Sequence, residues 1–164
     1  MAILDNYVEL LIDRYKAKGV LIDANLALLY LVGDGKYNKL SKYDTEDYYL
    51  LLRLKSFFKK AVTTPHVLTE VSNLTNDLPE QTKAECLKRF YDTFFGIDEL
   101  TIPSMDAAQR PEFHFLGLTD SALALVSDMY LIVTDDARLV KKMNESGLEA
   151  LNFNHLRMFH LLST

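Results

Sequence analysis

The clearest indication of the fold is Gly19-Val20-Leu21-Ile22-Asp23-Ala24-Asn25-Leu26, in which an acid follows a short apolar run. Three branched apolar residues after a glycine are typical of a buried strand, and the apolar residues that follow, up to Gly33, repeat at helical spacing. A buried strand followed by a helix is the repeating unit of a parallel sheet. We therefore predict that Asp23 stands at the carboxyl end of a strand in an α/β protein.

The same alternation of strand and helix continues on both sides of this stretch. The expected strands are 20–23, 62–64, 100–103, 130–134 and 148–153. The expected helices are 3–18, 24–32, 44–60, 79–95 and those starting at 65, 119, 136 and 154, with 34–43 a loop and 104–111 irregular. Such an alternation implies right-handed crossovers and a mostly parallel sheet with both faces covered. The predicted fold is a three-layer α/β/α sandwich.

Length and composition indicate one domain over residues 1–164, with an additional N-terminal helix in residues 1–17. The net charge of −5 argues against broad, nonspecific adhesion to nucleic acid. The single cysteine, Cys86, excludes an intrachain disulfide framework and a cysteine-based zinc cluster, and its amphipathic surroundings predict a buried thiol. The sequence shows no membrane-spanning segment and no signal-peptide pattern, so the expected location is the cytoplasm.

Four acids fall where hydrophobic segments begin or end: Asp23, Glu70, Asp120 and Asp136. An open parallel sheet gathers its functional residues at the carboxyl ends of its strands. We therefore expect these four carboxylates to meet in one cleft. Because their ligand atoms are oxygens, they favour Mg²⁺ or Mn²⁺.

Five segments resemble the PIN domains, a nuclease fold that includes the VapC-type toxins of toxin–antitoxin pairs. They are Leu21-Ile-Asp23-Ala-Asn25-Leu, Thr69-Glu70-Val-Ser-Asn-Leu74, Leu118-Thr-Asp120-Ser-Ala, Val133-Thr-Asp-Asp136-Ala-Arg-Leu139 and Leu151-Asn-Phe-Asn-His-Leu156. Their order and approximate spacing are those of the family, over residues 19 to 156. The resemblance implies that the four acids are catalytic metal ligands. It also implies that Asn25 and Thr134 support the first and last of them.

The function expected from this resemblance is an endoribonuclease that cleaves phosphodiester bonds with metal-activated water. Two divalent ions about 4 Å apart can stabilise the attacking and leaving oxygens of such a displacement. The implied substrate is single-stranded or structured RNA, and the implied partner is an antitoxin protein. Residues 1–17 and 34–43 are additions to the minimal domain and could form a contact with another partner or with a second copy of the chain. The helices 44–60 and 79–95 are expected to offer an apolar groove to an antitoxin helix. The alternative is a PIN-like module without activity that binds protein or RNA.

Each feature also has a purely structural interpretation. Asp120 and Asp136 both open helices, where a carboxylate stabilises the helix dipole without a metal. Asp135 would then be a cap, although the resemblance leaves it open to bind metal through water. Three basic residues beyond Asp136 could steer RNA or form an ordinary solvated face: Arg138, Lys141 and Lys142. The four histidines show no ligand spacing and are expected to be structural.

Overall fold

A computed structural model describes the backbone of residues 2–33 and 42–163, and the side chains of residues 6–33 and 42–158. The expected loop over residues 34–43 lies outside this description except for Lys42 and Tyr43. Within the described chain, no helix is both long enough and apolar enough to cross a membrane.

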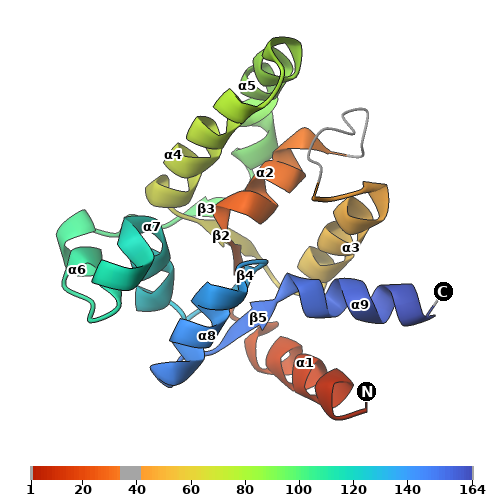
Figure 1. Ribbon diagram of the computed structural model, residues 1–164, viewed down its shortest axis with the longest axis vertical. Coiled ribbons are helices and arrows are strands. Elements are labelled where there is room, and N and C mark those ends of the chain that lie inside the picture. The colour runs from red at the N-terminus through yellow and green to blue at the C-terminus, as the bar shows by residue number, and fades with distance from the viewer. Residues whose placement is uncertain (1, 34–41, 164) are drawn as a thin grey trace.

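The described strands form one parallel sheet, as the sequence predicts. Its members are β1 (Val20–Ile22), β2 (Ala61–Thr63), β3 (Asp98–Glu99), β4 (Leu131–Thr134) and β5 (Ala150–Asn152), in the order β3-β2-β1-β4-β5. Every neighbouring pair is parallel. Figure 1 shows the sheet in the middle, with α6 (Ser104–Ala108) and α7 (Phe113–Leu125) to its left and α3 (Thr45–Ser56) and α9 (Phe153–Ser163) to its right. The α/β/α sandwich is confirmed.

Most of the helices that connect and cover these strands lie close to the predicted ranges; the exceptions are an unexpected helix at 104–108 and the helix expected from 119, which begins at 113. The helices are α1 (Ala2–Tyr15), α2 (Ala24–Val32), α3 (Thr45–Ser56), α4 (Pro65–Leu74), α5 (Glu80–Phe94), α6 (Ser104–Ala108), α7 (Phe113–Leu125), α8 (Ala137–Glu145) and α9 (Phe153–Ser163). A short 3₁₀ turn, η1 (Thr75–Asp77), joins α4 to α5. In Figure 1, α4 and α5 extend above the sheet and α1 lies below it.

Two predicted boundaries are wrong for identifiable reasons. The third helix ends at Ser56 rather than near residue 60. Lys59 N–H donates to the Lys16 carbonyl and the Lys60 carbonyl accepts from Val20 N–H, so the chain leaves the helix early to reach the sheet. The third strand lies at Asp98–Glu99 rather than at 100–103, and the region expected to be irregular contains α6.

The core lies against the two central strands. All residues of β1 and β4 are buried, and Leu21 and Ile132 are completely inaccessible. A strand that is apolar on both faces needs helices on both, which explains why β1 and β4 read as continuous apolar runs. Cys86 is buried, as predicted, and burial raises the pKa of its thiol.

A backbone break inside α7 sets the position of Asp120. Gly117 has φ 78° and ψ −173°, so the helix is interrupted there and starts again at Leu118. This left-handed φ is accessible to glycine at little cost and is unfavourable for other residues. Asp120 therefore lies in the first turn of a second helical segment, as expected for an acid that opens a helix.

Candidate functional site

The middle of the sheet contains a topological switch point. From β1 the chain builds β2 and β3 on one side, and then crosses back to place β4 on the other side of β1. In open α/β sheets the crevice for a ligand lies outside the carboxyl ends of the two strands at this point. Here those ends carry Asp23 after β1, and Asp135 and Asp136 after β4.

Asp23 is buried at the start of α2 and is held from two sides. One carboxylate oxygen accepts from Leu26 N–H at 2.9 Å and caps the helix. The other accepts from the Thr134 hydroxyl at the end of β4. An apolar strand followed at once by an N-cap residue produces this placement, because the cap turns the carboxylate back over the new helix.

Thr134 joins the ends of β1 and β4 through one oxygen atom. Its hydroxyl donates to Asp23 and accepts from the Asp136 backbone N–H at 2.9 Å. The Asp136 side chain then accepts from Arg138 N–H at 2.7 Å and Leu139 N–H at 3.3 Å, which makes it the N-cap of α8. Thr134 thus supports both the first and the last of the predicted acids.

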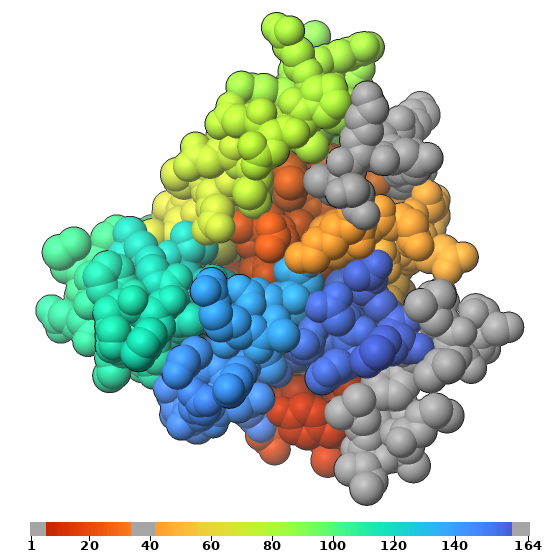
Figure 2. Space-filling view, viewed as in Figure 1, coloured from red at the N-terminus to blue at the C-terminus, as the bar shows by residue number. Residues whose placement is uncertain are grey.

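Glu70 and Asp120 reach the same region from α4 and α7, two helices that pack against each other. Figure 2 shows α2, α4, α7 and α8 meeting near the centre of the face in view. Both side chains are partly buried. Neither accepts a hydrogen bond from any residue whose side chain the structure describes. We call Asp23, Glu70, Asp120 and Asp136 the acidic edge.

Burial has a large effect on the ionisation of Asp23. Loss of hydration raises the pKa of this carboxyl to about 7. The hydrogen bonds from Thr134 and Leu26 oppose that rise, whereas the negative charges of Asp135 and Asp120 add to it. Asp23 and Asp120 therefore lie close enough to repel each other.

Asp120 links the other members of the acidic edge. Burial is again the first cause that raises its pKa to about 7, and the charges of Glu70 and Asp136 add to it, while Arg138 lowers it. Asp120 thus feels both of these acids and also acts on Asp23. The four acids that lie far apart in sequence share one electrostatic field.

The chemistry of the acidic edge fits a hard divalent cation, but its described side chains do not converge on one ion position. Carboxylate oxygens are the ligands that Mg²⁺ and Mn²⁺ prefer. Within the described part of the chain, no three Asp, Glu, His or Cys side chains are placed to hold an ion as they stand. Glu70 and Asp120, which are without hydrogen bonds to the described residues, are the members able to turn toward an ion.

Asp135 has a different role from the cap considered in the sequence analysis, because its neighbour Asp136 caps α8. The Asp135 side chain is fully buried and accepts from the Tyr43 hydroxyl. Lys42 Nζ lies 2.5 Å from one of its oxygens, and Asn25 Nδ2 donates to the other at 3.3 Å. Asn25 therefore contacts Asp135, whereas the resemblance assigns it to Asp23.

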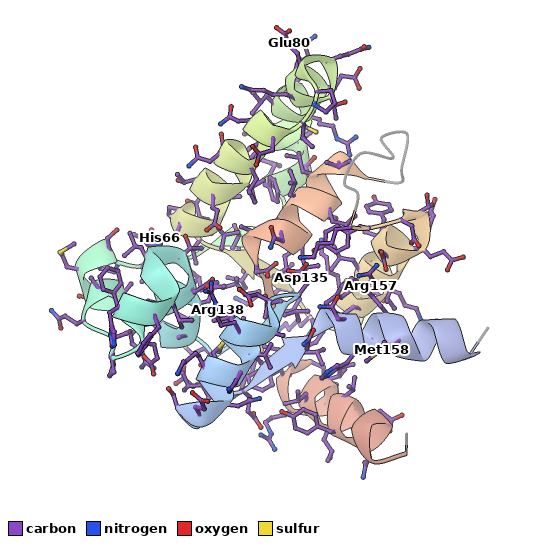
Figure 3. The ribbon with its side chains drawn as sticks, in the orientation of Figure 1. His66, Glu80, Asp135, Arg138, Arg157 and Met158 are labelled. Atoms are coloured by element: carbon purple, nitrogen blue, oxygen red, sulfur yellow. The ribbon has the colours of Figure 1, made fainter. Side chains whose placement is uncertain are left out.

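These contacts set the charge of Asp135. Burial alone would raise its pKa, but the hydrogen bonds from Lys42 and Tyr43 lower it overall. Burial and the same hydrogen bond raise the pKa of Tyr43. Arg157 of α9 extends this network, since it donates to the Lys42 carbonyl at 3.1 Å and to Asp47 at 2.6 Å. Figure 3 shows Asp135 near the centre of the molecule and Arg157 on α9.

The three basic residues of α8 differ in how free they are. Arg138 is exposed and approaches Asp136 at 3.9 Å. Lys141 is exposed, and its Nζ lies as far as 3.8 Å from Glu145 Oε1. Lys142 pairs with Glu145 at 2.8 Å and lies over the Phe115 ring, so its charge is already engaged. Of the three, Arg138 is nearest to the acidic edge.

One of the four histidines has a defined side-chain partner. His66 in α4 lies 3.0 Å from the Ser104 hydroxyl at the start of α6, through its Nε2 atom. It lines a hollow of about 540 Å³ that also includes Glu70. His66 and Glu70 are four residues apart and so lie on one helix face. That spacing is the only sequence signal that could have connected them.

Comparisons with known proteins assign no family. No protein-family model matches the chain. The sequence is similar to part of iron-regulated surface determinant protein B of Staphylococcus aureus, in strains JH9, Newman and COL. Identity is 36% over 63 residues, which are 38% of this chain and 10% of each relative. The chain thus spans about a tenth of the length of the curated relatives it matches.

Proposed function

We propose that this protein is a divalent-metal-dependent endoribonuclease of the PIN-domain type, acting on single-stranded or structured RNA. The observation that carries the proposal is the shared electrostatic field of the four acids at the switch point of the sheet. Burial and neighbouring acids raise the pKa of Asp23 and Asp120, and carboxyls shifted in this way are typical of functional sites. A cation bound there would offset this repulsion.

Each acid has a definite part in the proposed reaction. Asp23 is oriented by Leu26 N–H and the Thr134 hydroxyl, so it forms the rigid wall of the site. Glu70 and Asp120 supply carboxylates that accept no hydrogen bond from the described residues. Asp136 supplies a carboxylate at the start of α8. When bound, Mg²⁺ or Mn²⁺ would supply Lewis acidity and activate water near neutral pH. Arg138, which is exposed beside Asp136, would attract the RNA phosphates toward these acids.

A protein partner remains part of the proposal. An apolar groove of about 530 Å³ lies between α4 and α5, with Leu68, Leu87 and Phe90 among its lining residues. The groove expected from the sequence involved α5 and the helix at 44–60, whereas this one involves α5 and α4. It supports an antitoxin helix as the partner. A homodimer and a cytoplasmic location also stay predictions.

The alternative is a PIN-like module that binds RNA or protein without cleaving it. It is favoured by the absence of a preformed three-ligand group among the described side chains. It is also favoured by Asp23, whose two oxygens already accept hydrogen bonds. The alternative predicts RNA or partner binding that does not depend on metal.

Thermal unfolding with EDTA, Mg²⁺ or Mn²⁺ distinguishes the two functions, followed by cleavage of end-labelled single-stranded RNA. The nuclease gains about 2.7 kcal/mol of stability when free metal is a hundredfold above Kd. Asp120→Asn should abolish that gain and the cleavage. Asp92→Asn, the same change at an exposed position on α5, should keep both. RNA binding without a metal-dependent gain or cleavage would support the inactive module.

A further inference from the structure

The hollow beside Glu70 is lined by three elements that are separate in sequence: α4, α7, and the segment from residue 101 to the start of α6. Its volume of about 540 Å³ lies in the usual range for small-ligand sites. Glu70 belongs both to this hollow and to the acidic edge, so the two are contiguous. In Figure 3, His66 lies on the side of the molecule where α4 approaches α7.

The lining residues define the chemistry of the ligand. Six of them offer uncharged polar groups or an imidazole: His66, Thr69, Asn73, Thr101, Ser104 and Thr119. The side chains of Thr69, Asn73 and Thr119 make no hydrogen bond to any described residue, so their polar atoms are available to a ligand. No lysine or arginine lines the hollow. A phosphate therefore has no countercharge there, and it would be repelled by Glu70.

The remaining walls are apolar, from Pro65, Ile102 and Leu118. A ligand that presents apolar faces and a hydrogen-bonding edge, and carries no charge, matches this lining. An unpaired nucleobase has these properties, because its faces stack on apolar groups and its edge both donates and accepts. A lipid chain would leave the polar groups unpaired.

The contact between His66 and Ser104 orients one donor. His66 Nδ1 is buried and has no hydrogen-bond partner among the described residues. The tautomer that leaves Nδ1 as a bare nitrogen carries the ring proton on Nε2. Nε2–H then donates to Ser104 Oγ over the 3.0 Å between them. The Ser104 hydroxyl keeps its own proton for another acceptor, such as a base carbonyl or ring nitrogen.

We propose that this hollow binds one unpaired nucleobase of the RNA, next to the phosphate that the acidic edge would cleave. The inference rests on the proposed function for its substrate, but the binding itself needs neither metal nor cleavage. Asn73, with a donor and an acceptor on one amide, is the residue best suited to select the base. Ser104 adds the second directional contact.

The test is an NMR titration of the full chain in EDTA with adenosine, guanosine, cytidine, uridine and, as a base-free probe, ribose 5-phosphate. We expect one or two nucleosides to shift the amide signals of residues 65–73 and 101–104, with ribose 5-phosphate ineffective. Asn73→Ala should weaken the binding of that nucleoside about three- to tenfold, as expected for loss of one or two hydrogen bonds. Ser72→Ala is the matched control, because Ser72 is exposed on the same helix and outside this hollow.

Two results would overturn the inference. One is a response to ribose 5-phosphate equal to that of every nucleoside, which would indicate sugar binding. The other is unchanged nucleoside affinity in both Asn73→Ala and Ser104→Ala. Both substitutions are at exposed positions, and retained dispersion of the amide spectrum verifies the fold.

Cleavage of a random single-stranded RNA in Mn²⁺ separates this inference from the proposed function. A base preference beside the cut that disappears in Asn73→Ala supports both. Cleavage that is indifferent to the neighbouring base, in wild type as in the variant, overturns the base site and leaves the nuclease intact. Nucleoside binding without any cleavage supports the base site and contradicts the nuclease.

Discussion

Asp135 and Asp120 are two carboxylates at the same edge of the sheet, in opposite environments. Asp135 is fully enclosed and satisfied by Lys42, Tyr43 and Asn25, and its pKa is lowered overall. Asp120 is partly buried among other acids, accepts no hydrogen bond from the described residues, and has a pKa of about 7. The first acid stabilises the fold and the second opposes it. A carboxylate that costs stability needs another reason to be there, which is the argument for assigning function to Asp120.

The largest expected effect comes from removing the satisfied acid. Asp135→Ala leaves the Tyr43 hydroxyl and the Asn25 amide without their acceptor, and we expect a loss of about 3 kcal/mol in the free energy of unfolding. Lys42 is more than half exposed and regains water, which limits the loss. Urea unfolding at pH 7 measures it. Asp136→Ala removes only a partly exposed helix cap and should cost about 1 kcal/mol. Equal losses at the two positions would contradict the comparison.

The opposing acid should act in the other direction, with a defined pH dependence. A carboxyl whose pKa is higher in the folded state binds more protons when folded, so stability falls as pH rises from about 4 through 7. Asp120→Asn in EDTA should therefore stabilise the protein by about 1–2 kcal/mol at pH 8, after allowance for solvent screening. At pH 4 it should change little. Urea unfolding at both pH values measures the difference. A loss of stability at pH 8 would show that Asp120 is a structural acid.

The smallest effect on stability is expected at the exposed rim of the acidic edge. Arg138→Ala should change the free energy of unfolding by less than about 0.5 kcal/mol. If Arg138 contacts a phosphate, the variant should bind single-stranded RNA more weakly, with the slope of log K against log salt reduced by about 1. Fluorescence anisotropy with metal-free protein measures the RNA affinity and its dependence on salt. Lys142→Ala is the control, since Glu145 already pairs with Lys142. Equal losses of affinity would indicate a general basic face instead.

The sequence was sufficient where the signal is local. The apolar runs of β1 and β4 predict buried parallel strands, and Asp44 predicts the start of α3, where it forms a capping box with Asp47. The third strand could not be found this way, because it is only two residues long and both of them, Asp98 and Glu99, are charged and exposed. The five residues of α6 are likewise too few to show a helical period.

At the candidate site, the acids could be proposed from their positions, but their partners could not. The resemblance matched Asn25 with Asp23, whereas the fold brings it to Asp135, 110 residues away. The contact of His66 with Ser104 spans 38 residues and has no sequence motif. Such contacts depend on how α4, α6 and the strand ends pack in three dimensions, which no local pattern encodes.

The switch point also has a consequence for when the protein acquires its site. The Thr134 hydroxyl and Asp23 are 111 residues apart, and the strands that carry them are direct neighbours. Contacts of such long range form slowly, because a large loop must close first. During synthesis β1 is made long before β4, so Asp23 lacks its Thr134 partner until most of the chain has been made. A nascent chain that ends before β4 therefore lacks Thr134, Asp135 and Asp136, so the carboxyl end of β1 is complete only late in synthesis.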